Sequence, residues 1–77
     1  MVSVGTPRTA EEIRDMLHEA EERKKLWEQH YHSAKMDRKA NAEAIRNITA
    51  LRGVIKTLRW TLNMTDSNGI PIAHPLD

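Results

Sequence analysis

Residues 35–41 read KMDRKAN, and the fold of the chain depends on whether this stretch is helical. The flanking residues 9–34 and 41–64 contain no proline, and Gly53 is their only glycine. Lys, Met, Arg and Ala favour helix, and neither Gly nor Pro marks a turn within 35–41. We therefore expect an all-α protein with one continuous helix over about residues 9–64.

The alternative interpretation is a hairpin of two antiparallel helices, broken near 35–41. In the hairpin Asp37 or Asn41 would cap the second helix, because Asp and Asn accept hydrogen bonds from free backbone N–H groups at a helix start. In the continuous helix Asn41 would instead lie on the packing seam, where a polar residue sets register and oligomer number.

A continuous helix of about 55 residues would be about 80 Å long at 1.5 Å per residue. Such a rod has no interior of its own, so we expect it to self-associate as a coiled coil or helical bundle. A seven-residue series runs through both halves of the chain, at Ile13, Ala20, Trp27, Ala34, Asn41, Ile48, Ile55 and Leu62. The predicted association surface is Ile13, Leu17, Trp27, Tyr31, Asn41, Ile45, Ile48, Leu51, Ile55, Leu58 and Leu62.

The ends of the helical region are marked by local signals. Thr9 and Glu12 have the spacing of a capping box, so residues 1–8 form an N-terminal arm and the helix begins between residues 6 and 10. After Met64 the chain has turn chemistry, with Asn68 followed by Gly69. Residues 65–77 are therefore predicted to be a turn and an extended tail that contains proline.

The tail is apolar enough to dock on a surface rather than to stay solvated. If the chain reverses at Asn68 and Gly69, the extended residues reach back along the outer stripe of the helix. A glycine on that stripe would permit close backbone approach, and a tryptophan would supply apolar area. The residues predicted for this docking are Gly53, Trp60, Ile70, Ile72 and Leu76.

Composition excludes several functional classes. The chain has no Cys, and its four His residues do not have metal-ligand spacing: His30 and His32, two apart, lie on different faces of a helix. Phosphate-binding glycine loops, a nucleophile elbow and paired carboxylates in apolar surroundings are missing. We expect no enzymatic activity, no cofactor and no metal.

Net charge is +1, so the whole-chain field does not favour nucleic acid or a membrane surface. The distribution is uneven: residues 1–34 carry five basic and seven acidic side chains, and residues 35–77 carry seven basic and four acidic ones. The sequence has neither a secretory signal pattern nor eighteen consecutive apolar residues, and a cytoplasmic location is expected.

Residues 50–63 read ALRGVIKTLRWTLN, and this segment resembles stretches in small helical proteins of tailed bacteriophages. The resemblance covers 14 of 77 residues and transfers no site residue. It implies a virion-associated or assembly accessory protein, or a small regulator of a host protein.

Three functional hypotheses follow. The first is a non-enzymatic structural or assembly protein that self-associates into a homo-oligomer. The second is a small adaptor or inhibitor that binds a host protein through the apolar face of residues 44–64. The third and least favoured is a nucleic-acid-binding protein that uses the basic residues between 35 and 59.

Overall fold

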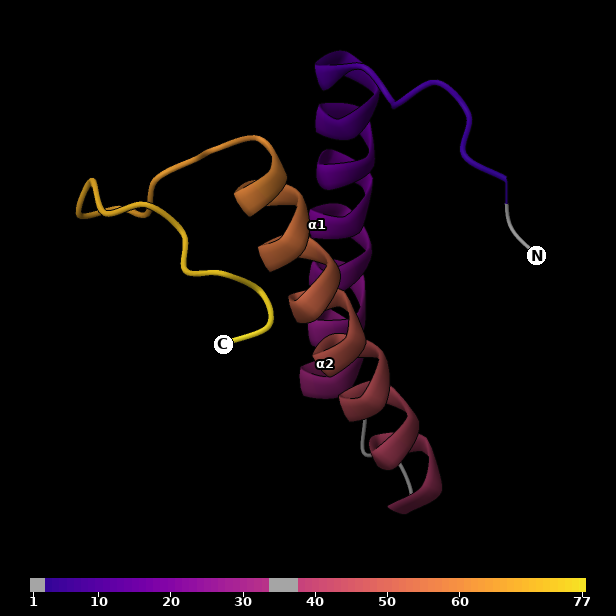
Figure 1. The fold of residues 1–77 in the computed structure, drawn as a ribbon. Coiled ribbons are helices and arrows are strands. Elements are labelled where there is room, and N and C mark those ends of the chain that lie inside the picture. The colour runs from indigo at the N-terminus through magenta and orange to yellow at the C-terminus, as the bar shows by residue number, and fades with distance from the viewer. Residues whose placement is uncertain (1–2, 34–37) are drawn as a thin grey trace.

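The computed structural model describes residues 3–33 and 38–77, and it contains two helices that run antiparallel, side by side (Figure 1). Helix α1 spans Ala10–Ser33 and helix α2 spans Arg38–Thr61. The N-terminal arm and the C-terminal tail leave this helical hairpin on opposite sides (Figure 1). The predicted all-α class is confirmed.

The leading prediction of one helix over residues 9–64 is not observed. The longest principal extent of the molecule is 44 Å, about half the length of the predicted rod, because α2 runs back along α1. The alternative prediction, the two-helix hairpin, describes the observed packing. Within the predicted break near 35–41, residues 35–37, among them the predicted cap Asp37, lie outside the described residues, and residues 38–41 belong to α2. Asn41 is already within α2, so it does not cap that helix.

Helix α1 begins at the predicted capping box. The Thr9 hydroxyl accepts a hydrogen bond from the Glu12 backbone N–H at 3.1 Å, and the Glu12 carboxylate accepts one from the Thr9 backbone N–H at 3.2 Å. Arg8 adds an ion pair to the same carboxylate at 3.0 Å. Two N–H groups that a helix start leaves unpaired are therefore satisfied locally.

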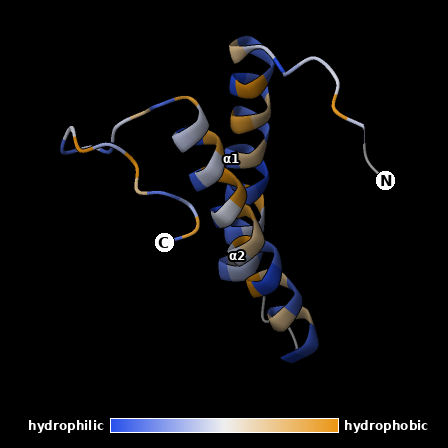
Figure 2. Cartoon of the chain, viewed as in Figure 1, coloured by the Kyte–Doolittle hydropathy of each residue, from blue (hydrophilic) through white to orange (hydrophobic). Residues whose placement is uncertain are grey.

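The core lies between the two helices and is narrow. Its central cluster joins Leu17 and Ala20 of α1 to Ile55 of α2, each about 5–6% exposed. Ala44 and Ile48 of α2 are also buried. Partly buried leucines pack against the central cluster, namely Leu51, Leu58 and Leu62. Figure 2 shows hydrophobic residues interrupting the hydrophilic ones along both helices, as this packing requires.

Helix α2 ends in a Schellman arrangement. Asn63 takes a positive φ of 56°, its N–H donates to the Trp60 carbonyl at 2.9 Å, and the Met64 N–H donates to the Arg59 carbonyl at 3.0 Å. Two carbonyls at the helix end are thereby satisfied. Asparagine tolerates this left-handed conformation better than most residues other than glycine.

The chain then reverses at the predicted turn. The Asp66 carboxylate accepts hydrogen bonds from the N–H groups of Asn68 and Ile70, at 2.8 and 3.0 Å. Gly69 has a positive φ of 78°, a conformation that glycine adopts without a Cβ penalty. An isolated antiparallel bridge joins Thr65 to Pro71, and the tail continues back beside α2 (Figure 1).

Over residues 3–33 and 38–77, neither helix combines the length and the apolar composition that crossing a membrane requires.

Candidate functional site

One side of the hairpin carries a shallow apolar groove between α1 and α2, which we call the open flank. Met16 and Val54 are 54% and 36% exposed there, whereas Ala20 is buried. Because Ala20 and Leu51 also belong to the core packing, the groove is an exposed continuation of the core. The open flank is defined by the apolar residues Met16, Ala20, Leu51 and Val54, and the ion-paired side chains Glu19 and Arg23 also line the groove.

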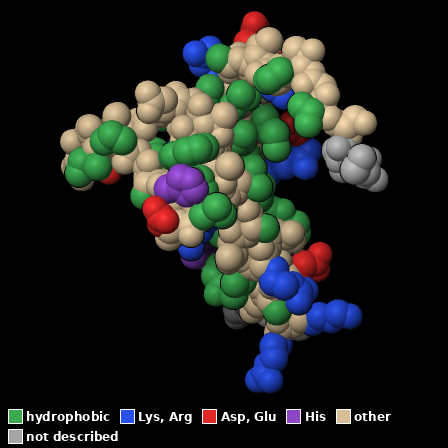
Figure 3. Space-filling view, viewed as in Figure 1, with side chains coloured by type: hydrophobic (Ala, Val, Ile, Leu, Met, Phe, Trp, Pro, Cys, Tyr) green, Lys and Arg blue, Asp and Glu red, His purple; other side chains and the backbone are tan. Residues whose placement is uncertain are grey.

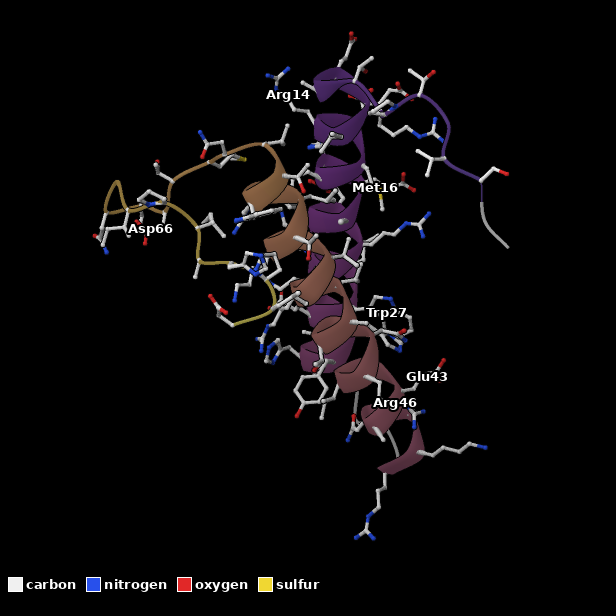
Figure 4. All side chains as sticks on the ribbon, viewed as in Figure 1. Arg14, Met16, Trp27, Glu43, Arg46 and Asp66 are labelled. Carbon is white, nitrogen blue, oxygen red and sulfur yellow. The ribbon has the colours of Figure 1, made fainter. Side chains whose placement is uncertain are left out.

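The open flank continues along α1 toward its C-terminal half. Met16 and Trp27 project on the same side of α1 (Figure 4), and Pro75 of the C-terminal tail shares a hollow with Met16 and Val54. A second hollow is lined by Leu26, Trp27 and His30, and the Trp27 and His30 rings meet edge-on at 5.8 Å. Leu26 is 63% exposed, so α1 presents apolar area over several turns.

Most of the predicted association surface is used inside the chain. Leu17, Ile48 and Ile55 are buried, and half-buried positions accompany them at Ile13, Trp27, Asn41, Leu51, Leu58 and Leu62. Tyr31 and Ile45 are exposed. We predicted that this seam needs another chain to cover it. Instead, each helix covers the seam of the other, since both helices belong to one chain and therefore meet at high effective concentration.

The tail-docking residues are brought together in part. Ile72 is half-buried and lines a hollow over α2, its N–H donating to the Met64 carbonyl at 3.2 Å. Trp60 meets the ring of His74 at a centroid distance of 5.1 Å. Ile70 and Leu76 remain exposed, Leu76 at 90%. The tail thus contacts the outer stripe through Ile72 and His74, and the expected contacts of Ile70 and Leu76 are not made.

Sequence reasoning missed His74 and Pro75 as docking residues. Pro75 is half-buried and shares a hollow with Gly53. The number of residues between the reversal at Gly69 and His74 could have pointed to them. The tail-docking residues were predicted from apolar character alone. The reason given for Gly53 is wrong, since a Cβ added there would meet no atom within 4 Å.

The two helices differ in charge. Helix α1 carries seven acidic and four basic side chains, and α2 carries one acidic and six basic ones. An ion pair between Arg59 and Glu21, 2.8 Å long, joins the two helices on the side opposite the open flank. Figure 3 shows Lys and Arg side chains gathered at one end of the visible face, over the first turns of α2.

Titratable groups do not assemble into a reaction centre in the part of the chain that the structure describes. No group of three or more His, Asp and Glu side chains there could hold a metal ion. The Glu12 carboxyl has a lowered pKa, caused by the hydrogen bond from the Thr9 backbone, then by Arg8 and by the Thr9 hydroxyl. That perturbation belongs to the helix cap and not to a cleft.

No protein-family model matches the chain, and no curated protein and no solved structure matches it. The resemblance of residues 50–63 to phage proteins therefore stays a prediction.

Proposed function

We propose that this protein is a non-enzymatic helical association module that self-associates. The open flank of one copy packs on the open flank of a second copy, and the four helices form a bundle. The observation that carries this proposal is the continuity between the open flank and the core through Ala20 and Leu51. Burying Met16 and Val54 in such an interface would extend the core outward on the side of the open flank.

The size of the core supports a need for a partner. Five hydrophobic residues are buried among the described residues: Leu17, Ala20, Ala44, Ile48 and Ile55. On folding, a chain of 77 residues buries a smaller fraction of its surface than a larger domain does, and oligomerisation is one way in which such short chains gain stability. A second hairpin is the simplest way to cover the remaining apolar area.

Charge favours one arrangement of the two copies. In a two-fold dimer the acidic α1 of one copy lies beside the basic α2 of the other, and the pairing is self-complementary. Placing α1 beside α1 would bring two acidic helices together, which costs free energy. We therefore expect α1 of one copy to contact α2 of the other.

Light scattering after size-exclusion chromatography tests this proposal. The wild-type chain is expected to elute as a dimer at micromolar concentration. Met16→Glu and Val54→Glu should each shift it to a monomer, because a charge in the buried centre of an interface costs several kcal/mol, roughly 2–4. Both side chains are exposed in the hairpin, so the helical circular-dichroism signal should be retained.

Val4→Glu is the matched control. Val4 is 99% exposed in the N-terminal arm and does not line the open flank, so this variant should remain dimeric. A wild-type chain that stays monomeric up to high micromolar concentration would refute the proposal.

The adaptor hypothesis now ranks second. It assigned partner binding to the face of residues 44–64, and α1 covers that face at Ala44, Ile48 and Ile55. A host protein would have to use the open flank instead, and then one stoichiometric partner would co-purify with the monomer. A role in phage assembly depends on the resemblance of residues 50–63.

A further inference from the structure

The side of the hairpin opposite the open flank contains a concave site that self-association does not use. Three elements build it: α1, α2 and the C-terminal tail. Ile55 forms an apolar floor at 6% exposure, and Ile72 of the tail forms a second apolar wall. We call this site the tail pocket.

Basic side chains dominate the rim of the tail pocket. Arg52, Lys56 and Arg59 of α2 line it at spacings of four and three residues, which places them on one stripe of the helix. Lys24 lines it from α1, and Glu21 is the acidic member. Like charges four residues apart destabilise a helix, so repulsion between Arg52 and Lys56 lowers the stability of α2, and a bound anion would relieve this repulsion.

The ion pairs leave two of these cations available. Glu21 is paired with Arg59 at 2.8 Å, and Lys24 is paired with Glu28 at 3.3 Å. Within the described part of the chain, Arg52 and Lys56 have no ion-pair partner. The pocket therefore holds two unneutralised positive charges beside an apolar floor.

The tail is held in place by contacts outside the pocket. Ile72 is anchored by its hydrogen bond to the Met64 carbonyl, and the His74 ring packs edge-on against Trp60. Ile72 is thus held by its own hydrogen bond to Met64 and by the contact of His74, two residues later, with Trp60. Such support keeps a binding site formed before the ligand arrives.

We propose that the tail pocket binds a phosphate monoester in its dianionic form. Two negative charges match the two unpaired cations, whereas one carboxylate would leave a cation unneutralised. The Arg52 guanidinium suits bidentate contact with phosphate oxygens, and the Lys56 ammonium adds a mobile point charge. Ile55 and Ile72 provide a surface for the apolar part of the ester. This site shares no lining residue with the open flank, so it does not require the proposed dimer.

Binding is tested by two-dimensional NMR titration of the full chain at pH 8 with phenyl phosphate and with inorganic phosphate. Sodium chloride at the same ionic strength is the reference, because screening alone moves exposed charged groups. We expect saturable shifts at Ile55 and Ile72 with both phosphates, with tighter binding of phenyl phosphate. Shifts that do not saturate, or that chloride reproduces, would overturn the proposal.

Substitution then locates the site. Arg52→Gln and Lys56→Gln, singly, should each weaken binding by about tenfold, or about 1.4 kcal/mol, since each removes a charge-assisted contact. Arg46→Gln is the matched control: Arg46 is an exposed arginine of α2 that does not line the tail pocket, and its loss should leave the affinity unchanged. Equal affinity in all three variants would overturn the assignment.

Two further binding measurements distinguish the phosphate site from the proposed dimer and from nucleic-acid binding. The Met16→Glu variant should bind phenyl phosphate like the wild type even where dimerisation is lost, so the two proposals fail independently. The second measurement uses a single-stranded oligonucleotide of twelve nucleotides. If it binds and phenyl phosphate does not, the small-ligand site is overturned in favour of nucleic-acid binding.

Discussion

Arg59 Nη2 lies 2.8 Å from Glu21 Oε2, and this contact links residues 38 positions apart across the hairpin. Both side chains are 41% exposed, so solvent screens the pair strongly. A double-mutant cycle with Glu21→Gln and Arg59→Gln should give a coupling free energy of about 0.2–1 kcal/mol, decreasing with added salt. Coupling of zero at low salt would show that the two helices do not keep this register in solution.

The core prediction compares two isoleucines of the same helix. Ile55→Ala should lower the free energy of unfolding by about 2–5 kcal/mol, because it removes buried methyl groups from the central cluster. Ile45 is 48% exposed, and Ile45→Ala should cost less than about 1 kcal/mol. Urea unfolding at one fixed protein concentration measures both. Similar losses for the two variants would contradict the observed orientation of α2.

Gly53 offers a stabilising substitution. It lies inside α2, and a Cβ there would meet no atom within 4 Å. Gly53→Ala should therefore raise the free energy of unfolding by about 0.5–1 kcal/mol through helix propensity and a less flexible unfolded chain. The thermal unfolding midpoint measures this gain. A loss of stability instead would indicate that the tail or a partner needs the free space at this position.

The cap of α1 predicts a pH dependence. The Glu12 pKa is lowered in the folded chain, so its carboxylate stabilises the fold fully above the unfolded pKa of about 4.5. That contribution is lost as pH falls through the folded pKa, because protonation removes the hydrogen bond from the Thr9 backbone. Glu12→Gln should flatten the acid limb of the stability curve below pH 4.5. Glu11→Gln, one residue away and outside the capping box, is the control and should keep the wild-type slope.

Local features of this protein could be predicted from residue chemistry at short range. Thr9 and Glu12 form the expected cap, and Asn68 and Gly69 lie in the expected reversal. The sequence predicted that the tail contacts Trp60. The contact is made by the His74 ring, which packs edge-on against the Trp60 ring, and Ile70 and Leu76 stay exposed. Which tail side chains turn inward depends on backbone geometry that composition does not encode.

By itself the sequence determined which residues had to leave water: Ala20, Ile48 and Ile55 of the seven-residue series are buried, as that spacing requires. Only the tertiary structure decided what covers that seam. A helix in the same chain and a helix in a second chain present the same side chains, so periodicity cannot distinguish them. Once the chain folds back, α1 and α2 meet without the entropy cost of bringing two molecules together.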